Sequence, residues 1–287
     1  MTATTDRPTS TTHVATHGVT FGGLLRSEWI KLRSLRSTFW CAIIIVVLSL
    51  GLASLLAATL RSDPMPSGAA LMPFAVQSVT LSSGFTSLVA AVLGALVITG
   101  EFGTGMIRST FTAAPRRVPA LVAKAVVVTI VVFVIAAISA VVAGMLAVAI
   151  FGARGLSVDL SDGGYWLALL GDAGYLALIA LLSFAIGALI RNSAGGIATA
   201  LGLILVLPTV ANLFAVLAKA TWAQNVSAFL PSDAGSGMMT YLAPDRPAVP
   251  VPAGQIVLEP WQGLLVLLAW IVVLGAAAIV VIRRRDV

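Results

Sequence analysis

Side chains that could form a metal or catalytic site are few and scattered in this chain. His13 and His17 are four residues apart and could share a helix face, but no glutamate or cysteine lies near them to complete a metal site. We therefore expect two solvated histidines. The aspartates Asp159, Asp162 and Asp172 have no histidine partner, so an enzyme built from them inside a membrane is a remote alternative.

Nucleotide chemistry is not expected on this chain. A phosphate-binding loop needs the pattern GxxxxGK[ST], and none of the three lysines, Lys31, Lys124 and Lys219, follows a glycine. Cys41 is the single cysteine, which excludes an intrachain disulfide. We expect no catalytic, cofactor-binding or metal-binding residue here, and transport or scaffolding instead of covalent chemistry.

The composition is that of a membrane protein. Hydrophobic residues make up 59% of the 287 residues and charged residues 10%, against roughly 45–50% and 25% in soluble domains. The net charge of +6 does not indicate nucleic-acid binding, because the cations flank apolar segments and are not interleaved with aromatic residues. Membrane lipid is the expected surrounding.

Six apolar segments predict an all-α integral membrane protein. Each reaches the roughly 20 residues that a helix needs to cross a bilayer, and none shows the short alternating pattern of a barrel strand. They make up a permease-like domain at 39–287, with spans at about 39–60, 74–99, 125–151, 166–190, 195–218 and 261–282.

The lysines and arginines predict the orientation. With the N-terminus inside, only four of the 17 basic residues lie on the outer side, and cytoplasmic loops are the ones enriched in these residues. The expected topology is N-in/C-in in the cell (plasma) membrane. The four outer residues are Arg61, Arg154, Lys219 and Arg246.

The region before the first span divides in two. Residues 1–18 have no apolar period and are expected to be a disordered tail. Residues 19–38 predict an amphipathic helix in the inner interface, with Trp29 at headgroup depth and Arg33 on the polar face. Glu28 falls inside the apolar stripe; it could pair with Lys31 or contact a cytoplasmic partner. The stripe consists of Phe21, Leu24, Leu25, Trp29, Leu32, Leu35 and Phe39.

Polar residues inside the spans have two interpretations. The hydroxyls of Ser82 and Thr86 could donate hydrogen bonds to backbone carbonyls, which we favour. Alternatively, these two residues could line a translocation pathway. Asp172 is either a functional carboxylate or, as we favour, a residue near the outer interface, with the lipid-buried part beginning at Ala173. In the fifth span, Pro208 should kink the helix and Asn212 needs a partner, so both are possible hinge or pathway residues.

Two polar connections stand out. Residues 219–260 form a long outer loop, and its proline run at 244–252 disfavours helix and predicts an extended lid. Residues 101–124 lie between the second and third spans and hold one carboxylate, four cations and two prolines. This inner loop could be a docking site for a soluble partner. The alternative is that its cations only anchor the loop in the cytoplasm, as the positive-inside rule describes.

Four stretches together resemble permease subunits of the type-2 ABC transporter family. They are LLRSEWIKLRSLRSTFW (24–40), GEFGTGMIRSTFTAAPRRVPALVAKA (100–125), GALIRNSAGGIATA (187–200) and EPWQGLLVLLAW, followed at the C-terminal end by RRRD (259–286). The likeness covers most of residues 20–287. It implies a six-helix exporter subunit that dimerises with a second copy or a homologous permease. It also implies a separate ATP-binding subunit that carries ATP and Mg.

The resemblance implies a coupling helix that docks on the ATP-binding subunit. Carried over, it would be about residues 104–112, with Glu101 and Arg108 as polar contacts and Pro115 at its end. Family members often fold short helices into the connection before the last span, which the proline run puts in question here. The substrate is not implied. The alternative is a self-contained secondary transporter or channel. The candidate coupling residues are Glu101, Phe102, Gly103, Thr104, Arg108, Arg116 and Arg117.

Overall fold

The computed structural model describes residues 20–60, 68–107, 109, 117–218, 221–242 and 254–284, and these are helical or irregular, with no strand among them. Six helical stretches in this part of the chain are long and apolar enough to cross a membrane, as predicted. They are α2 (Arg36–Thr59), α3 (Met72–Thr80) with α4 (Ser83–Thr104), α6 (Arg117–Ala153), α7 (Gly163–Ile190), α8 (Ser193–Leu201) with η2 (Gly202–Val206) and α9 (Leu207–Ala218), and α12 (Pro260–Arg284). The residues predicted for the tail, 1–18, and Arg108 and Arg116 lie outside the described residues.

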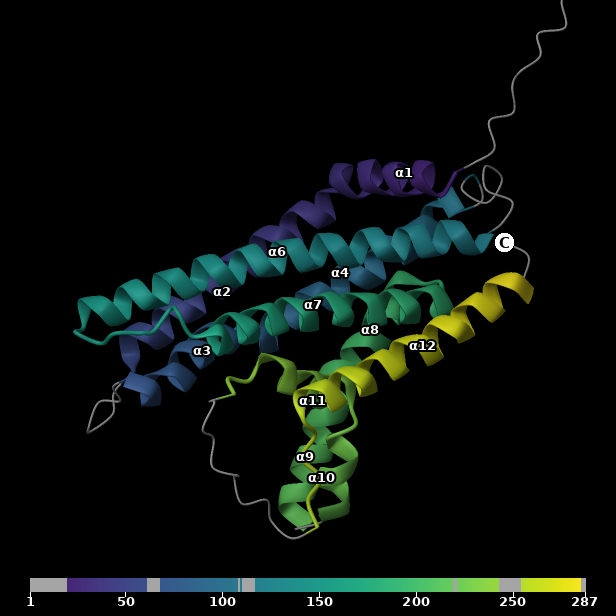
Figure 1. Cartoon of the computed structure of the whole chain (residues 1–287). Helices are drawn as coiled ribbons and strands as arrows, with labels where there is room; N and C mark the ends of the chain where they lie inside the picture. The colour runs from purple at the N-terminus through teal and green to yellow at the C-terminus, as the bar shows by residue number, and fades with distance from the viewer. Residues whose placement is uncertain are drawn as a thin grey trace, which may run out of the picture.

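Helix α7 is the centre of the bundle and packs against α4, α6, α8 and α12 (Figure 1). Its contact with α4 depends on glycine. A Cβ added at Gly94 would lie 2.0 Å from the carbonyl oxygen of Ala180, and one at Gly187 would lie 3.1 Å from the carbonyl oxygen of Ala95. The two backbones therefore approach as closely as small residues allow, which is how helices associate in lipid.

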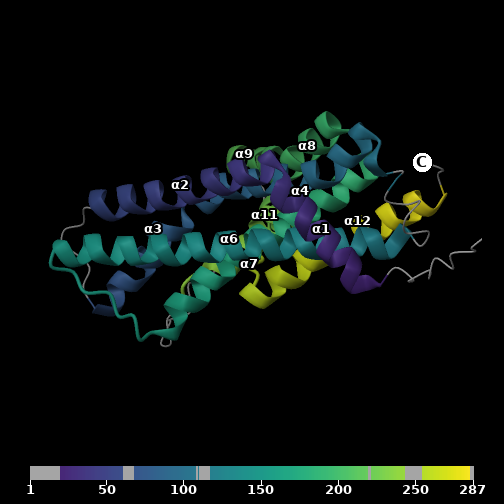
Figure 2. The same ribbon diagram turned by 90° about the horizontal axis from the view of Figure 1, so that it is seen from above.

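The chain before the first span forms its own helix, α1 (Phe21–Ser34), which lies across α6 (Figure 2). Thr20 caps it by accepting a hydrogen bond from the backbone N–H of Gly23. The prediction of one helix over 19–38 is wrong at its end, because Leu35 is extended and α2 begins at Arg36. The change of direction splits the predicted stripe, so that Leu32 is buried while Phe39 is exposed.

The second span is interrupted at Leu81 and Ser82, where a continuous helix over 74–99 was predicted. The hydroxyls of Ser78 and Ser82 donate to the carbonyl oxygens of Ala75 and Val79, at 2.7 Å and 2.9 Å. Serine hydroxyls that bond the backbone locally compete with the helical ladder. Thr86 does the same on the carbonyl oxygen of Ser82, at 3.1 Å.

The fifth span contains a π-helical segment, η2, immediately before Pro208. The N–H of Leu207 bonds the carbonyl oxygen of Gly202, five residues back. Because proline has no N–H to continue the regular ladder, an irregular turn at this position is expected. The Pro208 side chain is buried.

The connection before the last span corrects the prediction of an extended lid. Short helices α10 (Thr221–Ser227) and α11 (Pro231–Ser236) and the 3-10 turn η3 (Gly237–Met239) occupy its first half. Pro231 begins α11, where a missing N–H costs nothing. The proline run at 244–252 lies outside the described residues. It led to the wrong prediction for residues 221–239, which precede it in the sequence.

Candidate functional site

Four charged side chains from three helices meet at the end of the bundle that holds α1. Glu28 and Lys31 come from α1, Glu101 from the end of α4, and Lys124 from α6. The Lys31 amine lies 2.8 Å from Oε1 of Glu28 and 3.2 Å from Oε1 of Glu101. The Lys124 amine lies 2.7 Å from the same oxygen of Glu101 and also pairs with Oε2 of Glu28. We call these four residues the charge cluster.

Three members of the charge cluster are almost fully buried. Glu28 is 4% exposed, Lys124 5% and Glu101 7%. Removing such charges from water costs several kcal/mol per ion, and each is tolerated only because an opposite charge replaces the water. The Lys31 side chain reaches solvent. Burial would lower its pKa, but the hydrogen bond to Glu28 and the charges of Glu101 and Glu28 raise that pKa above 10.5, so Lys31 is cationic at neutral pH.

Glu101 therefore lies in α4 and not in an exposed loop, which corrects its expected position, while its contact with a partner stays a prediction. Helix α4 continues past it to Thr104, and Gly105 ends the helix in the left-handed conformation with φ 73°. Gly103 and Thr104 are exposed at this end. Oε2 of Glu101 is buried and has no hydrogen-bond partner among the described residues.

A second group of contacts at the same end holds the C-terminal end of α12. The Arg117 guanidinium donates to the carbonyl oxygen of Ile282, and that of Arg191 donates to the carbonyl oxygen of Val281, each at 3.2 Å. The Arg191 guanidinium also lies 5.4 Å from the ring centroid of Phe102. Cations beside the last carbonyls of a helix are favourable because those carbonyls carry its negative end. Arg117, predicted as a loop residue, begins α6.

The sequence of the chain shows the protein family to which this six-span bundle belongs. The chain matches a family model described as ABC-2 family transporter protein over residues 24–209, which is more than half of its length. The chain belongs to this family. With six membrane-length helices, it is a membrane-spanning permease subunit of an ABC transporter. A comparison with curated proteins found no match.

The part that matches the ABC-2 family contains every residue of the charge cluster. The match begins within α1 and ends within α9, so α10, α11 and α12 lie outside it. Sequence reasoning missed Lys124 as a member, because it was taken as the end of a loop. A lysine seven residues after the start of an apolar helix is the signal that could have found it.

In this ABC-2 permease, Asp172 lies inside the bundle. Helix α7 runs without a break from Gly163, and Asp172 is 5% exposed. Its carboxylate accepts a hydrogen bond from the hydroxyl of Ser83, the first residue of α4. This burial comes from neighbouring helices, and the interpretation that the lipid-buried part of the span begins at Ala173 stays a prediction. Asp172 joins α7 to the break in the second span.

The remaining predicted residues lie apart from the charge cluster. The amide of Asn212 donates to Asp233 at 3.2 Å and its oxygen accepts from Ser227 at 3.1 Å, so Asn212 connects α9 to the short helices α11 and α10. Trp29 and Arg33 lie on the exposed side of α1. The structure therefore brings Glu28, Lys31 and Glu101 together and leaves the candidate pathway residues elsewhere.

Proposed function

We propose that this permease subunit works with a separate ATP-binding subunit, which docks at the end holding the charge cluster, and that it exports a substrate together with a second permease copy or a homologous permease. ATP and Mg would bind on the partner. In this proposal both termini are cytoplasmic. Two findings support it: basic residues flank the spans on one predicted side, and α1 and the C-terminal end of α12 lie at the same end of the bundle (Figure 1).

The observation that carries the proposal is the charge cluster itself. It ties α1, α4 and α6 together where the chain leaves α4 toward residues 105–116. Separating these helices would leave buried charges without partners, at a cost of several kcal/mol. A partner that moves residues 105–116 would therefore move all three helices as one body, and packed helices transmit such movements in discrete steps.

The arginine contacts extend that body to the last span. Arg117 and Arg191 hold the end of α12, and Phe102, which follows Glu101, lies against the Arg191 guanidinium. Movement at the end of α4 would reach α7 and α12 through these contacts. A docked subunit would thus act on five helices from one place. Coupling also requires that the docked subunit make different contacts with two conformations of the permease.

Co-purification tests the proposed partner. The tagged chain is extracted from its native membranes in mild detergent, and co-eluting proteins are identified and assayed for ATP hydrolysis. We expect a protein with a phosphate-binding loop in constant ratio to the chain, and hydrolysis that disappears when the loop lysine of that protein is replaced. A chain that elutes without any nucleotide-binding protein, yet carries solute in response to an ion gradient, would contradict the proposal and favour a self-contained carrier.

A further inference from the structure

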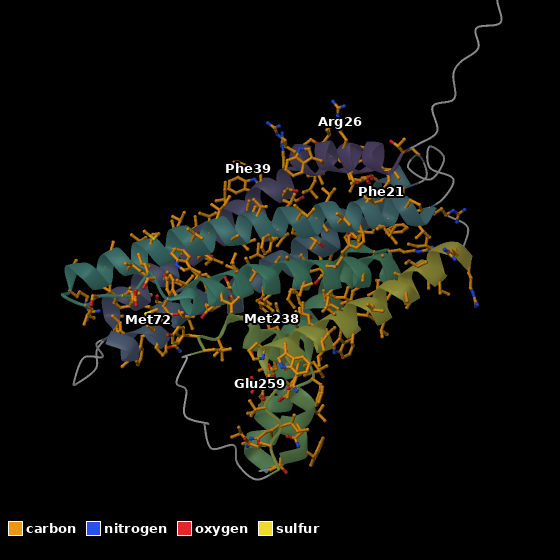
Figure 3. The ribbon with its side chains drawn as sticks, viewed as in Figure 1. Phe21, Arg26, Phe39, Met72, Met238 and Glu259 are labelled. Carbon is orange, nitrogen blue, oxygen red and sulfur yellow. The ribbon has the colours of Figure 1, made fainter. Side chains whose placement is uncertain are left out.

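A cavity of about 370 Å³ opens at the other end of α7, between its first turns, the segment 238–242 and the start of α12. Its walls are mostly apolar, with Thr240 among them, and no charged side chain of the described residues lines it. Met238, which lines the cavity, and Glu259, which directly precedes its wall in α12, are labelled in Figure 3. The large side chains of the wall are Leu167, Leu170, Met238, Leu242, Trp261 and Leu264.

The spans predicted at about 166–190 and 261–282 place the cavity at one end of the fourth and sixth spans. Its lining on α7 reaches Gly171, eight residues after Gly163, which corresponds to roughly 12 Å along the helix. One leaflet contributes about 15 Å of hydrocarbon. Trp166 near the start of α7 and Trp261 near the start of α12 mark the interface, where tryptophan is enriched.

The mouth of the cavity is continuous with the lipid-facing surface. Leu167, Leu170 and Trp261 line the cavity and are 65%, 50% and 61% exposed. The next turns of α12 expose Leu265 and Leu268 on the outside of the same span. A hydrocarbon chain can therefore enter from the bilayer without crossing water. Water itself is a poor occupant, because it needs two to four polar partners.

The cavity keeps its shape because the segment 238–242 is fixed to α7 at two points. The Tyr241 hydroxyl donates to the carboxylate of Asp162, which caps α7. This hydrogen bond and burial raise the pKa of Tyr241 to about 12, so the donor keeps its proton at neutral pH. At Gly171 the backbone of Met238 is so close that an added Cβ would lie 1.8 Å from its carbonyl oxygen.

We propose that this cavity is a binding site for one acyl chain of an outer-leaflet phospholipid. Its volume falls within the range of ligand pockets, about 300–1,000 Å³, but its described lining residues do not include the convergent polar groups that orient a polar ligand. The occupant is therefore recognised by its apolar chain. The acyl chain fills the space between α7, α12 and the segment 238–242, whose spacing the contacts within the protein already fix. The assignment to the outer leaflet rests on the proposed orientation of the chain, but the site does not depend on docking of the ATP-binding subunit.

Quenching by a brominated lipid tests the site on the purified chain alone. The chain in dodecylmaltoside micelles is titrated with phosphatidylcholine that carries bromine on its acyl chain, and tryptophan fluorescence is followed. We expect a saturable quenching component that is lost in Trp261→Phe. The double variant Leu264→Phe/Thr240→Phe, which fills the cavity, should bind at least about tenfold more weakly.

The matched control is Leu265→Phe/Leu268→Phe, which introduces two phenylalanines on the exposed side of α12, outside the cavity lining, and should retain the saturable component. Three results would overturn the proposal: no saturable component in the wild type, the same component in Trp261→Phe, or equal quenching by a brominated maltoside detergent at equal concentration. If the filled variant does not fold, Trp261→Phe and the detergent comparison decide. None of these results bears on whether an ATP-binding subunit docks at the opposite end.

Discussion

Replacing Lys124 with methionine should lower the free energy of unfolding by about 3–5 kcal/mol, the usual cost of removing one partner from a buried ion pair. Methionine keeps the length of the side chain but not its charge. Glu28 and Glu101 would then face each other in a buried site, where Lys31 is the cation among the described residues that still pairs with them. Reversible unfolding in mixed detergent micelles measures the change.

Two further variants separate charge from packing. Lys31→Met is the matched control: its side chain is 28% exposed, against 6% for Lys124, so its loss should cost less than half as much. Combining Lys124→Met with Glu28→Gln and Glu101→Gln should recover most of the stability, because no buried charge is then left unpaired. An unfolding free energy for Lys124→Met within about 1 kcal/mol of the wild type would mean that the cluster does not hold the helices together.

Gly171→Ala should destabilise the contact between α7 and the segment 238–242 by about 3 kcal/mol, the upper part of the range for overpacking a tight contact. The added methyl group would lie 1.8 Å from the carbonyl oxygen of Met238, which is backbone and cannot rotate away. The segment 238–242 must therefore shift, and the hydrogen bond from Tyr241 to Asp162 should loosen with it. Thermal unfolding and amide hydrogen exchange in residues 237–242 measure the two effects.

Gly174→Ala is the control in the same helix. Its added methyl group meets only the end of the Met238 side chain, at 3.5 Å, which is an ordinary contact. This variant should gain up to about 1 kcal/mol from the higher helix propensity of alanine. Equal stability and equal exchange rates in the two variants would show that α7 and the outer segment are not in the close contact described.

The sequence predicted the membrane-spanning architecture well because that signal is local. Each of the six spans is recognised from about 20 neighbouring residues, and the quoted stretches were sufficient to indicate the ABC-2 family, which the family match then showed. The short outer helices were missed. The prolines at 244–252 disfavour helix at their own positions, but they carry no information about residues 221–239, where the short helices form.

The charge cluster could be predicted only in part. The spacing of Glu28 and Lys31 indicated their pair, which the structure contains. The contacts of Glu101 with Lys31 and Lys124 depend on how α1 crosses α6, which no short stretch of sequence encodes. Asp172 and Ser83 are 89 residues apart in sequence, so their contact likewise follows from tertiary packing.

Cysteine labelling at the end of α4 tests the central claim most directly. In a Cys41→Ser background, Thr104→Cys places a thiol at an exposed position beside the charge cluster, and Ser161→Cys places one in the exposed α6–α7 connection at the opposite end. We predict that a membrane-impermeant maleimide labels Cys at 161 from outside the cell. It should label Cys at 104 only in inside-out vesicles, and the ATP-binding subunit should protect that site. Labelling at 104 from outside, or equal labelling with and without the subunit, would contradict the account.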